Sequence, residues 1–216
     1  MLEVKLECIR PDMEIHYTTD GSEPTATSPL YEKIVPVKEA LTLKGAIFAH
    51  GRQMGKTLIL PVRWNLATAK PVLGTNPTEK LLTNGIRGSL KYSDFEWCSW
   101  ADNDSVSFTI DLLKPEMLNT LTLGCITNNG MAIHKPASVR VEVSDDNSKF
   151  REAVVQSFTS EEIFREGNFI ENLSLKLGGT QARYVRVTAK GPGVCPASHV
   201  RPGQTSRIFF DEVMLE

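Results

Sequence analysis

The chain has 216 residues, which is longer than most single domains and predicts one large domain or two small ones. Its 24 Lys and Arg against 26 Asp and Glu give a formal net charge of −2, whereas a domain dedicated to nucleic acids normally carries a basic excess. With 15 Gly and 12 Pro it is neither collagen-like nor of low complexity, and no apolar run approaches the roughly 18 residues of a membrane span, so we expect a folded chain with no nucleic-acid partner and no membrane span.

The first 66 residues have the pattern of a small β-sandwich. Apolar and charged residues alternate over 2–7, and a second alternating run at 14–19 ends at an Asp-Gly dipeptide that favours a tight turn. Two more strand-like runs follow at 41–48 and 57–64. Several short strands separated by turn residues indicate a sandwich. A signal peptide would begin with basic and then apolar residues, so this start indicates a cytoplasmic protein or a fragment of a secreted one.

Residues 67–79 have the composition of a linker. They contain Pro71, Gly74 and Pro77 and few large apolar residues. We therefore expect a first domain at 1–66 and a second at 80–216, joined by a semi-rigid, proline-containing segment.

The second domain has the pattern of a larger β-sandwich of the jelly-roll type. Along residues 105–112 every second side chain is apolar. Further strand-like runs lie at 118–126, 138–144, 172–177, 184–189 and 208–215. A helix of about two turns is expected to begin at Ser160, as its N-cap, and to end at Gly167. Because no long helix separates the strands, we expect antiparallel sheets.

Cysteine spacing and catalytic motifs give mainly exclusions. The four cysteines contain no C-x-x-C pair, so the spacing predicts no structural zinc site, and they are either free buried thiols or include one disulfide. The chain has no G-x-S-x-G elbow, H-E-x-x-H, P-loop or G-x-G-x-x-G after a strand. We therefore expect no catalytic site in this chain.

Three loop-like segments carry residues suited to binding. Residues 92–100 hold four aromatics, of which we expect Trp97 in the core, while Trp100 either covers the core or stacks on a sugar. Residues 127–134 are rich in amides, and residues 191–207 form a long loop, a kind that is often functional. A plain surface loop is the alternative for the amide-rich segment. The candidate sugar-facing side chains are Trp100, Asn128, Asn129, His134 and Arg201.

Several motifs between residues 80 and 216 resemble the discoidin domain, also called the coagulation factor V/VIII type C domain. They are L-T-N-G at 82–85, R-G-S at 87–89, F-T-I-D-L at 108–112, P-A-S-V-R-V-E-V-S-D-D at 136–146, A-R-Y-V-R-V at 182–187 and F-D-E-V at 210–213. The form with Cys195-Pro196 ahead of His199 is similar to the domain that ends Bacteroides-type β-N-acetylhexosaminidases (chitobiases) of glycoside hydrolase family 20.

The first domain resembles the small sandwich that follows the catalytic barrel in those enzymes. The resemblance rests on I-H-Y-T-T-D-G-S-E-P at 15–24 and S-P-L-Y at 28–31. It implies a non-catalytic accessory region whose intramolecular partner is a missing catalytic barrel and whose Met1 is an added start. The parent protein would be periplasmic or extracellular.

The resemblance also implies a ligand and a cofactor. Discoidin domains of such enzymes are commonly carbohydrate-binding modules of family 32, which here predicts a galactose or N-acetylhexosamine type glycan at loops on one end. The alternatives are a domain that only braces the barrel or its oligomer, or one that recognises protein or phospholipid. A structural calcium near the first loop would use Asn84, Ser89 and Glu212, and it would be weakened because Asn84 replaces an Asp.

Overall fold

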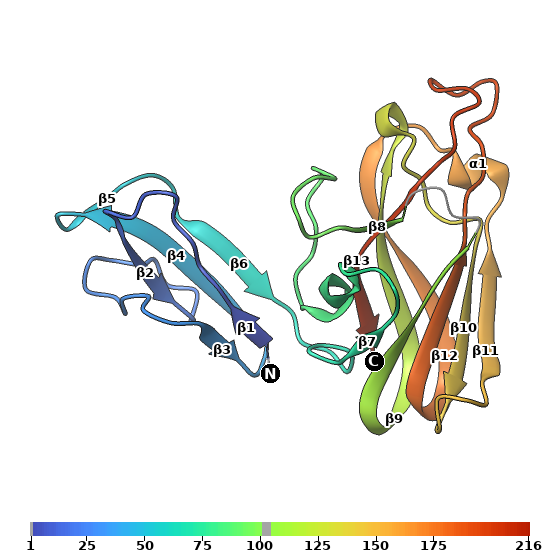
Figure 1. Ribbon diagram of the computed structural model, residues 1–216, viewed down its shortest axis with the longest axis horizontal. Coiled ribbons are helices and arrows are strands. Elements are labelled where there is room, and N and C mark those ends of the chain that lie inside the picture. The colour runs from blue at the N-terminus through green and yellow to red at the C-terminus, as the bar shows by residue number, and fades with distance from the viewer. Residues whose placement is uncertain (1, 101–104) are drawn as a thin grey trace. The chain divides into compact units, whose positions relative to one another are not determined.

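The computed structural model describes residues 2–100 and 105–216 (Figure 1). The chain divides into two compact units, Met1–Trp64 and Asn65–Glu216. Regular structure in the described residues is almost entirely β, which confirms the predicted fold class. No helix in these two ranges is both long and apolar enough to cross a membrane.

The first unit is a small antiparallel sandwich. One sheet pairs β1 (Leu2–Val4) with β3 (Val35–Val37), and the other is centred on β4. The strands of the second sheet are β2 (Glu14–Thr18), β4 (Leu41–Ala49), β5 (Arg52–Gln53) and β6 (Leu58–Val62). Val37 and Leu43, one from each sheet, are fully buried in the core between them. After β2 the predicted turn forms, with Gly21 at φ +79°.

The second unit is a larger antiparallel sandwich with three short helices among its described residues. Its strands are β7 (Val72–Leu73), β8 (Cys98–Trp100), β9 (Ser105–Asn128), β10 (Ser138–Ser144), β11 (Arg151–Ser157), β12 (Asn168–Lys190) and β13 (Ile208–Leu215). The helices are the 3₁₀ helices η1 (Glu79–Thr83) and η2 (Asn129–Met131) and the α-helix α1 (Ser160–Ile163). The hydrogen-bonded order is β11-β10-β12-β9-β13-β8, with β7 also on β9.

The long strands β9 and β12 form the centre of this unit. They pair antiparallel from Asn168 opposite Asn128 to Lys190 opposite Ser105, with register shifts between Lys176 and Thr180 and between Ala182 and Tyr184. Figure 1 shows both strands doubling back at one end, so each contributes to both layers. The alternation predicted for residues 105–112 is confirmed, because the even-numbered apolar side chains from 106 to 112 are buried in the core.

The expected linker at residues 67–79 is wrong, because these residues are part of the second unit. Ala67 is fully buried in its core, and β7 pairs with β9. The backbone N–H of Leu66 donates to the carbonyl of Leu215 at 3.0 Å. The segment is anchored through backbone bonds and through Ala67 and Val72, both of which pack in or against the core.

The helix predicted from Ser160 to Gly167 is shorter than expected. α1 ends at Ile163, and its N-cap is Thr159, whose hydroxyl accepts from the backbone N–H of Glu162. The Glu162 side chain in turn accepts from the N–H of Thr159, which completes a capping box. The sequence therefore predicted a helix start correctly, but the N-cap lies one residue earlier and the helix has a single turn.

The four cysteines are all free thiols. Cys98, Cys125 and Cys195 are buried, while Cys8 is half-buried. Burial raises the pKa of the Cys98 thiol to about 12, so it remains protonated at neutral pH. Of the two alternatives, free buried thiols and one disulfide, the structure has the first.

Candidate functional site

One end of the second unit is built from three segments that lie next to strand ends. η2 continues β9, the turn after α1 leads into β12, and residues 191–207 join β12 to β13 (Figure 1). The N–H of Asn129 donates to the carbonyl of Gly167 at 3.2 Å, and the N–H of His134 donates to the carbonyl of Arg207 at 3.1 Å. These bonds join the three segments, which we call the loop end (residues 128–134, 164–168 and 191–207).

A buried polar network holds the loop end together. The Asn129 side-chain oxygen accepts from the N–H of Gly167 at 2.6 Å, and its amide nitrogen lies 3.2 Å from Nε2 of His199. That Nε2 atom lies 3.1 Å from Nε2 of His134. Burial, reinforced by the neighbouring His199, lowers the pKa of His134 to about 4, so His134 is neutral at neutral pH. Asn129 and His134 are both buried, and the expectation that they face a sugar is wrong.

Trp100 also lies in the core, so it cannot stack on a sugar. Its ring, on β8, is stacked near Phe108 at a centroid distance of 6.2 Å and meets Phe210 edge-on at 5.6 Å. Trp97 is buried as expected, and its indole N–H donates to the carbonyl of Ser89 at 3.1 Å. Both tryptophans of residues 92–100 therefore pack in the interior, although the segment around them is polar.

Two of the predicted residues remain accessible at the loop end. Arg201 is exposed, and its guanidinium donates to the carbonyl of Gly130 and, at 3.3 Å, to the side-chain oxygen of Gln204. A guanidinium has five N–H donors, so further donors are available for a ligand. Asn128 is half-buried at the end of β9, where its backbone pairs with Ile133.

Phe95 is the one exposed aromatic ring among the described residues of the second unit, with 88% exposure. It has φ +71°, a conformation uncommon for a bulky side chain. Asp94 holds the local backbone by accepting from the N–H groups of Ser89 and Glu96 at 2.6 and 3.1 Å. The nearby Tyr92 packs edge-on against Phe209 at 6.1 Å. The loop thus presents a large ring to solvent from a fixed backbone.

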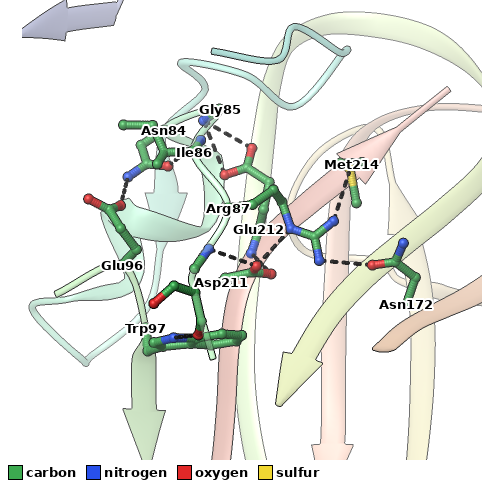
Figure 2. Close-up of polar contacts among 12 residues, drawn as sticks. Asn84, Gly85, Ile86, Arg87, Glu96, Trp97, Asn172, Asp211, Glu212 and Met214 are labelled. Carbon is green, nitrogen blue, oxygen red and sulfur yellow. Dashed lines mark hydrogen bonds and ion pairs between the residues drawn. The ribbon is translucent and has the colours of Figure 1, made fainter. Parts of the chain in front are cut away.

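A second polar region surrounds the F-D-E-V motif on β13 (Figure 2). Asp211 is fully buried and pairs with Arg87, whose Nε lies 2.7 Å from Oδ2. The N–H of Gly88 donates to the same oxygen at 3.0 Å, and Nη2 of Arg87 donates to Asn172 at 2.8 Å. Burial raises the pKa of Asp211, while Arg87 opposes that shift by favouring the charged carboxylate.

The neighbouring carboxyl groups of Glu212 and Glu96 have uncharged hydrogen-bond partners. Both oxygens of the buried Glu212 lie 3.1 Å from the N–H of Gly85. The Asn84 amide donates to Glu96 at 2.8 Å and accepts from the N–H of Ile86 at 2.9 Å. Burial raises the pKa of Glu212 to about 9, and it raises that of Glu96 as well. We call Glu96, Asp211 and Glu212 the carboxylate cluster; with Arg87 as counter-charge, it favours a proton or a bound cation.

The donor atoms of the carboxylate cluster suit a hard cation. The carboxylate oxygens of Glu212 and Glu96 and the amide oxygen of Asn84 are hard donors, the kind that calcium binds. Ser89 has a different set of contacts: its hydroxyl accepts from the N–H of Lys91 at 3.2 Å. Asn84, Ser89 and Glu212 stay the predicted calcium ligands, and Glu96, which the sequence motifs do not point to, contacts Asn84.

Comparison with known families identifies the second unit. Residues 67–200 match the F5/8 type C domain, and residues 2–58 match the chitobiase/β-hexosaminidase C-terminal domain. The chain belongs to the F5/8 type C domain family. The order of the two matches confirms the resemblance drawn from the sequence motifs.

Solved structures similar to this F5/8 type C chain include CpGH89CBM32-6 from Clostridium perfringens, at 18% identity over 71% of this chain and 98% of that one, with a TM-score of 0.46. A fucose binding module from Streptococcus pneumoniae has 17% identity over 71% and 97%, with a TM-score of 0.43. The C-terminal domain of a chitobiase from Bacteroides fragilis has 16% identity over 63% and 78%, with a TM-score of 0.38. No relative was found among the curated proteins.

Sequence reasoning missed several residues of the F5/8 type C domain that organise these two regions. His199, in the long loop, contacts both Asn129 and His134, and its position in the sequence gives no sign of these partners. Arg87 forms an ion pair with the buried Asp211 of the F-D-E-V motif. Phe95 lies between two acidic residues, a context that does not distinguish an exposed ring from a buried one.

Proposed function

We propose that this chain is a non-catalytic accessory region of a longer periplasmic or extracellular glycoside hydrolase, and that its F5/8 type C domain binds a glycan at the loop end. The observation that carries the proposal is that Arg201 and Asn128 reach solvent from the loop end, whose interior is held by the buried contact between Asn129 and His199. Phe95 adds an exposed aromatic ring on the separate loop at residues 89–96. The match of residues 2–58 to the chitobiase/β-hexosaminidase C-terminal domain supports a β-N-acetylhexosaminidase as the parent enzyme.

The chemistry of these side chains suits a sugar. Arginine and asparagine donate hydrogen bonds to hydroxyl or N-acetyl oxygens, and an aromatic face packs on the C–H surface of a pyranose ring. A galactose or N-acetylhexosamine type glycan meets both requirements. A weak site tethered to an enzyme raises the local substrate concentration without taking part in catalysis.

The test is affinity electrophoresis through gels that contain a polymeric glycan with galactose or N-acetylhexosamine residues. We expect the wild-type chain to be retarded, and Arg201→Ala to weaken the apparent affinity about tenfold, because a hydrogen bond from a charged group is lost. Arg140→Ala, an exposed arginine on β10, is the control and should migrate as wild type. Wild-type migration unaffected by every such glycan would contradict the proposal and favour a domain that only braces its enzyme.

We further propose that the carboxylate cluster, with Asn84, holds a structural calcium ion. The three carboxyl groups and one guanidinium there leave excess negative charge if all are ionised, and a divalent cation would balance it. We expect the thermal unfolding temperature of the wild type to be higher in calcium than in a chelator. The unfolding temperature of Glu212→Gln should be the same in both. Identical melting of the wild type in calcium and in chelator would contradict this.

A further inference from the structure

Three potential metal ligands converge inside the loop end. They are His134, which follows η2, and Cys195 and His199 of the long loop; all three are buried, and their ligand atoms lie within 4.8 Å of one another. The prediction that there is no structural zinc site rested on the absence of a C-x-x-C pair. Ligands from two separate loops that include a single cysteine escape that pattern.

The spacing of the two imidazole nitrogens is close to that in a zinc centre. Two imidazole nitrogens, each about 2.05 Å from a tetrahedral ion, lie about 3.3 Å apart. The Nε2 atoms of His134 and His199 are 3.1 Å apart, so these two imidazoles need only a small adjustment to admit an ion, and the Cys195 sulfur lies within 4.8 Å of both. A mixed set of imidazole and thiolate ligands favours zinc over the hard cations.

The surroundings of the ligands are already ordered. The Cys195 sulfur lies 3.4 Å from the hydroxyl of Ser206, which can donate to a thiolate. The backbone N–H of Cys195 donates to the carbonyl of Gln204 at 2.9 Å, and its carbonyl accepts from Gly203 at 3.0 Å. Hydrogen bonds of this kind orient metal ligands and tune their affinity.

The hydrogen bonds of His199 define what must change when an ion binds. The N–H of Arg201 donates to Nδ1 of His199 at 3.0 Å, so in neutral His199 the proton sits on Nε2 and points to His134. An ion between the two Nε2 atoms replaces that proton, which moves to Nδ1. The Arg201 N–H must then give up its bond, and Cys195 must lose its thiol proton to solvent.

We propose that His134, Cys195 and His199 bind one zinc ion, with water as the fourth ligand, and that the ion clamps residues 191–207 to the end of β9. The site would stabilise the backbone that carries Arg201. The proposal does not depend on glycan binding, because all three ligands are internal and buried.

The test uses the full chain, reduced and stripped of metal with a chelator, and then titrated with Zn²⁺ or Co²⁺. We expect one equivalent to bind, a thiolate-to-cobalt charge-transfer absorption with Co²⁺, and a selective NMR shift of the Arg201 amide. Saturating Zn²⁺ should raise the melting temperature by roughly 5 °C or more.

Two serine variants separate this site from adventitious thiol binding. Cys195→Ser should lose the charge-transfer band and bind at least about 100-fold more weakly. Cys8→Ser, which removes the half-buried thiol of the first unit, should behave as wild type. If Cys195→Ser does not fold, the wild-type cobalt spectrum decides alone. Absence of that band, or its persistence in Cys195→Ser, would overturn the proposal.

Discussion

The loop end and the carboxylate cluster are both polar regions inside one β-sandwich, but they differ in charge. At the loop end the buried groups contact one another as amide and imidazole, and the charged Arg201 lies outside. In the carboxylate cluster the buried groups are acidic, with Asp211 and Glu212 fully inaccessible. We therefore propose the first region as the binding surface, and we expect the second to govern how stability depends on pH.

The largest effect should come from breaking the ion pair of the carboxylate cluster. Arg87→Met leaves Asp211 buried without its partner, which we expect to cost about 3–5 kcal/mol of unfolding free energy. Arg140→Met, at the exposed pair with Glu152, should cost at most about 1 kcal/mol. Chemical denaturation measures both, and equal losses would contradict the contrast between a buried and an exposed pair.

The pH dependence of stability should come next. Since the pKa of Glu212 is raised to about 9 in the folded chain, above the ordinary value of 4.5, its contribution is present below pH 4.5 and is lost as pH rises through 9. In a chelator, unfolding free energy should therefore fall as pH rises across this window, and Glu212→Gln should flatten the fall. Stability that rises with pH over the same window in both proteins would contradict the assignment.

Neutral contacts at the loop end should matter less. Asn129→Ala removes the acceptor for the N–H of Gly167, and we expect a loss of about 1–3 kcal/mol. Faster hydrogen exchange should appear in residues 164–168 and 191–207 while the strand core stays protected. Uniform acceleration throughout the sandwich would show that this network is not local to the loops.

The smallest effect on stability is expected at Phe95. Replacing this exposed, positive-φ residue by Gly relieves backbone strain, so unfolding free energy should stay level or rise by up to about 1 kcal/mol. Glycan retardation in affinity electrophoresis should nevertheless weaken. If the variant lost stability but was retarded by the glycan as strongly as the wild type, Phe95 would contribute to packing and not to binding.

The fold was predictable where local pattern and burial agree. Alternation over residues 105–112 predicted a buried face, and those side chains are buried. The linker prediction for residues 67–79 was wrong because β7 pairs with β9 and the adjacent Leu66 bonds to β13, and local composition does not encode these long-range contacts. The helix N-cap is Thr159 and not the adjacent Ser160. Both residues have a hydroxyl group that can cap a helix, so residue type alone did not distinguish them.

The candidate site was predictable only in part, for a related reason. The sequence located Asn129, His134 and Arg201 in loops that do meet, but residue type alone does not say which side chains point inward. The polar side chains of His134 and Asn129 are buried inside the fold, whereas the apolar side chain of Phe95 is exposed. Direction depends on long-range packing, as with Arg87 and Asp211, which lie 124 positions apart.

NMR chemical-shift mapping with soluble galactose and N-acetylhexosamine oligosaccharides tests the glycan proposal most directly. The account predicts saturable chemical-shift changes that concentrate at Asn128, Arg201 and Phe95. The amide signals around the carboxylate cluster should not shift. Shifts centred on the carboxylate cluster, or none anywhere with any of these sugars, would contradict it.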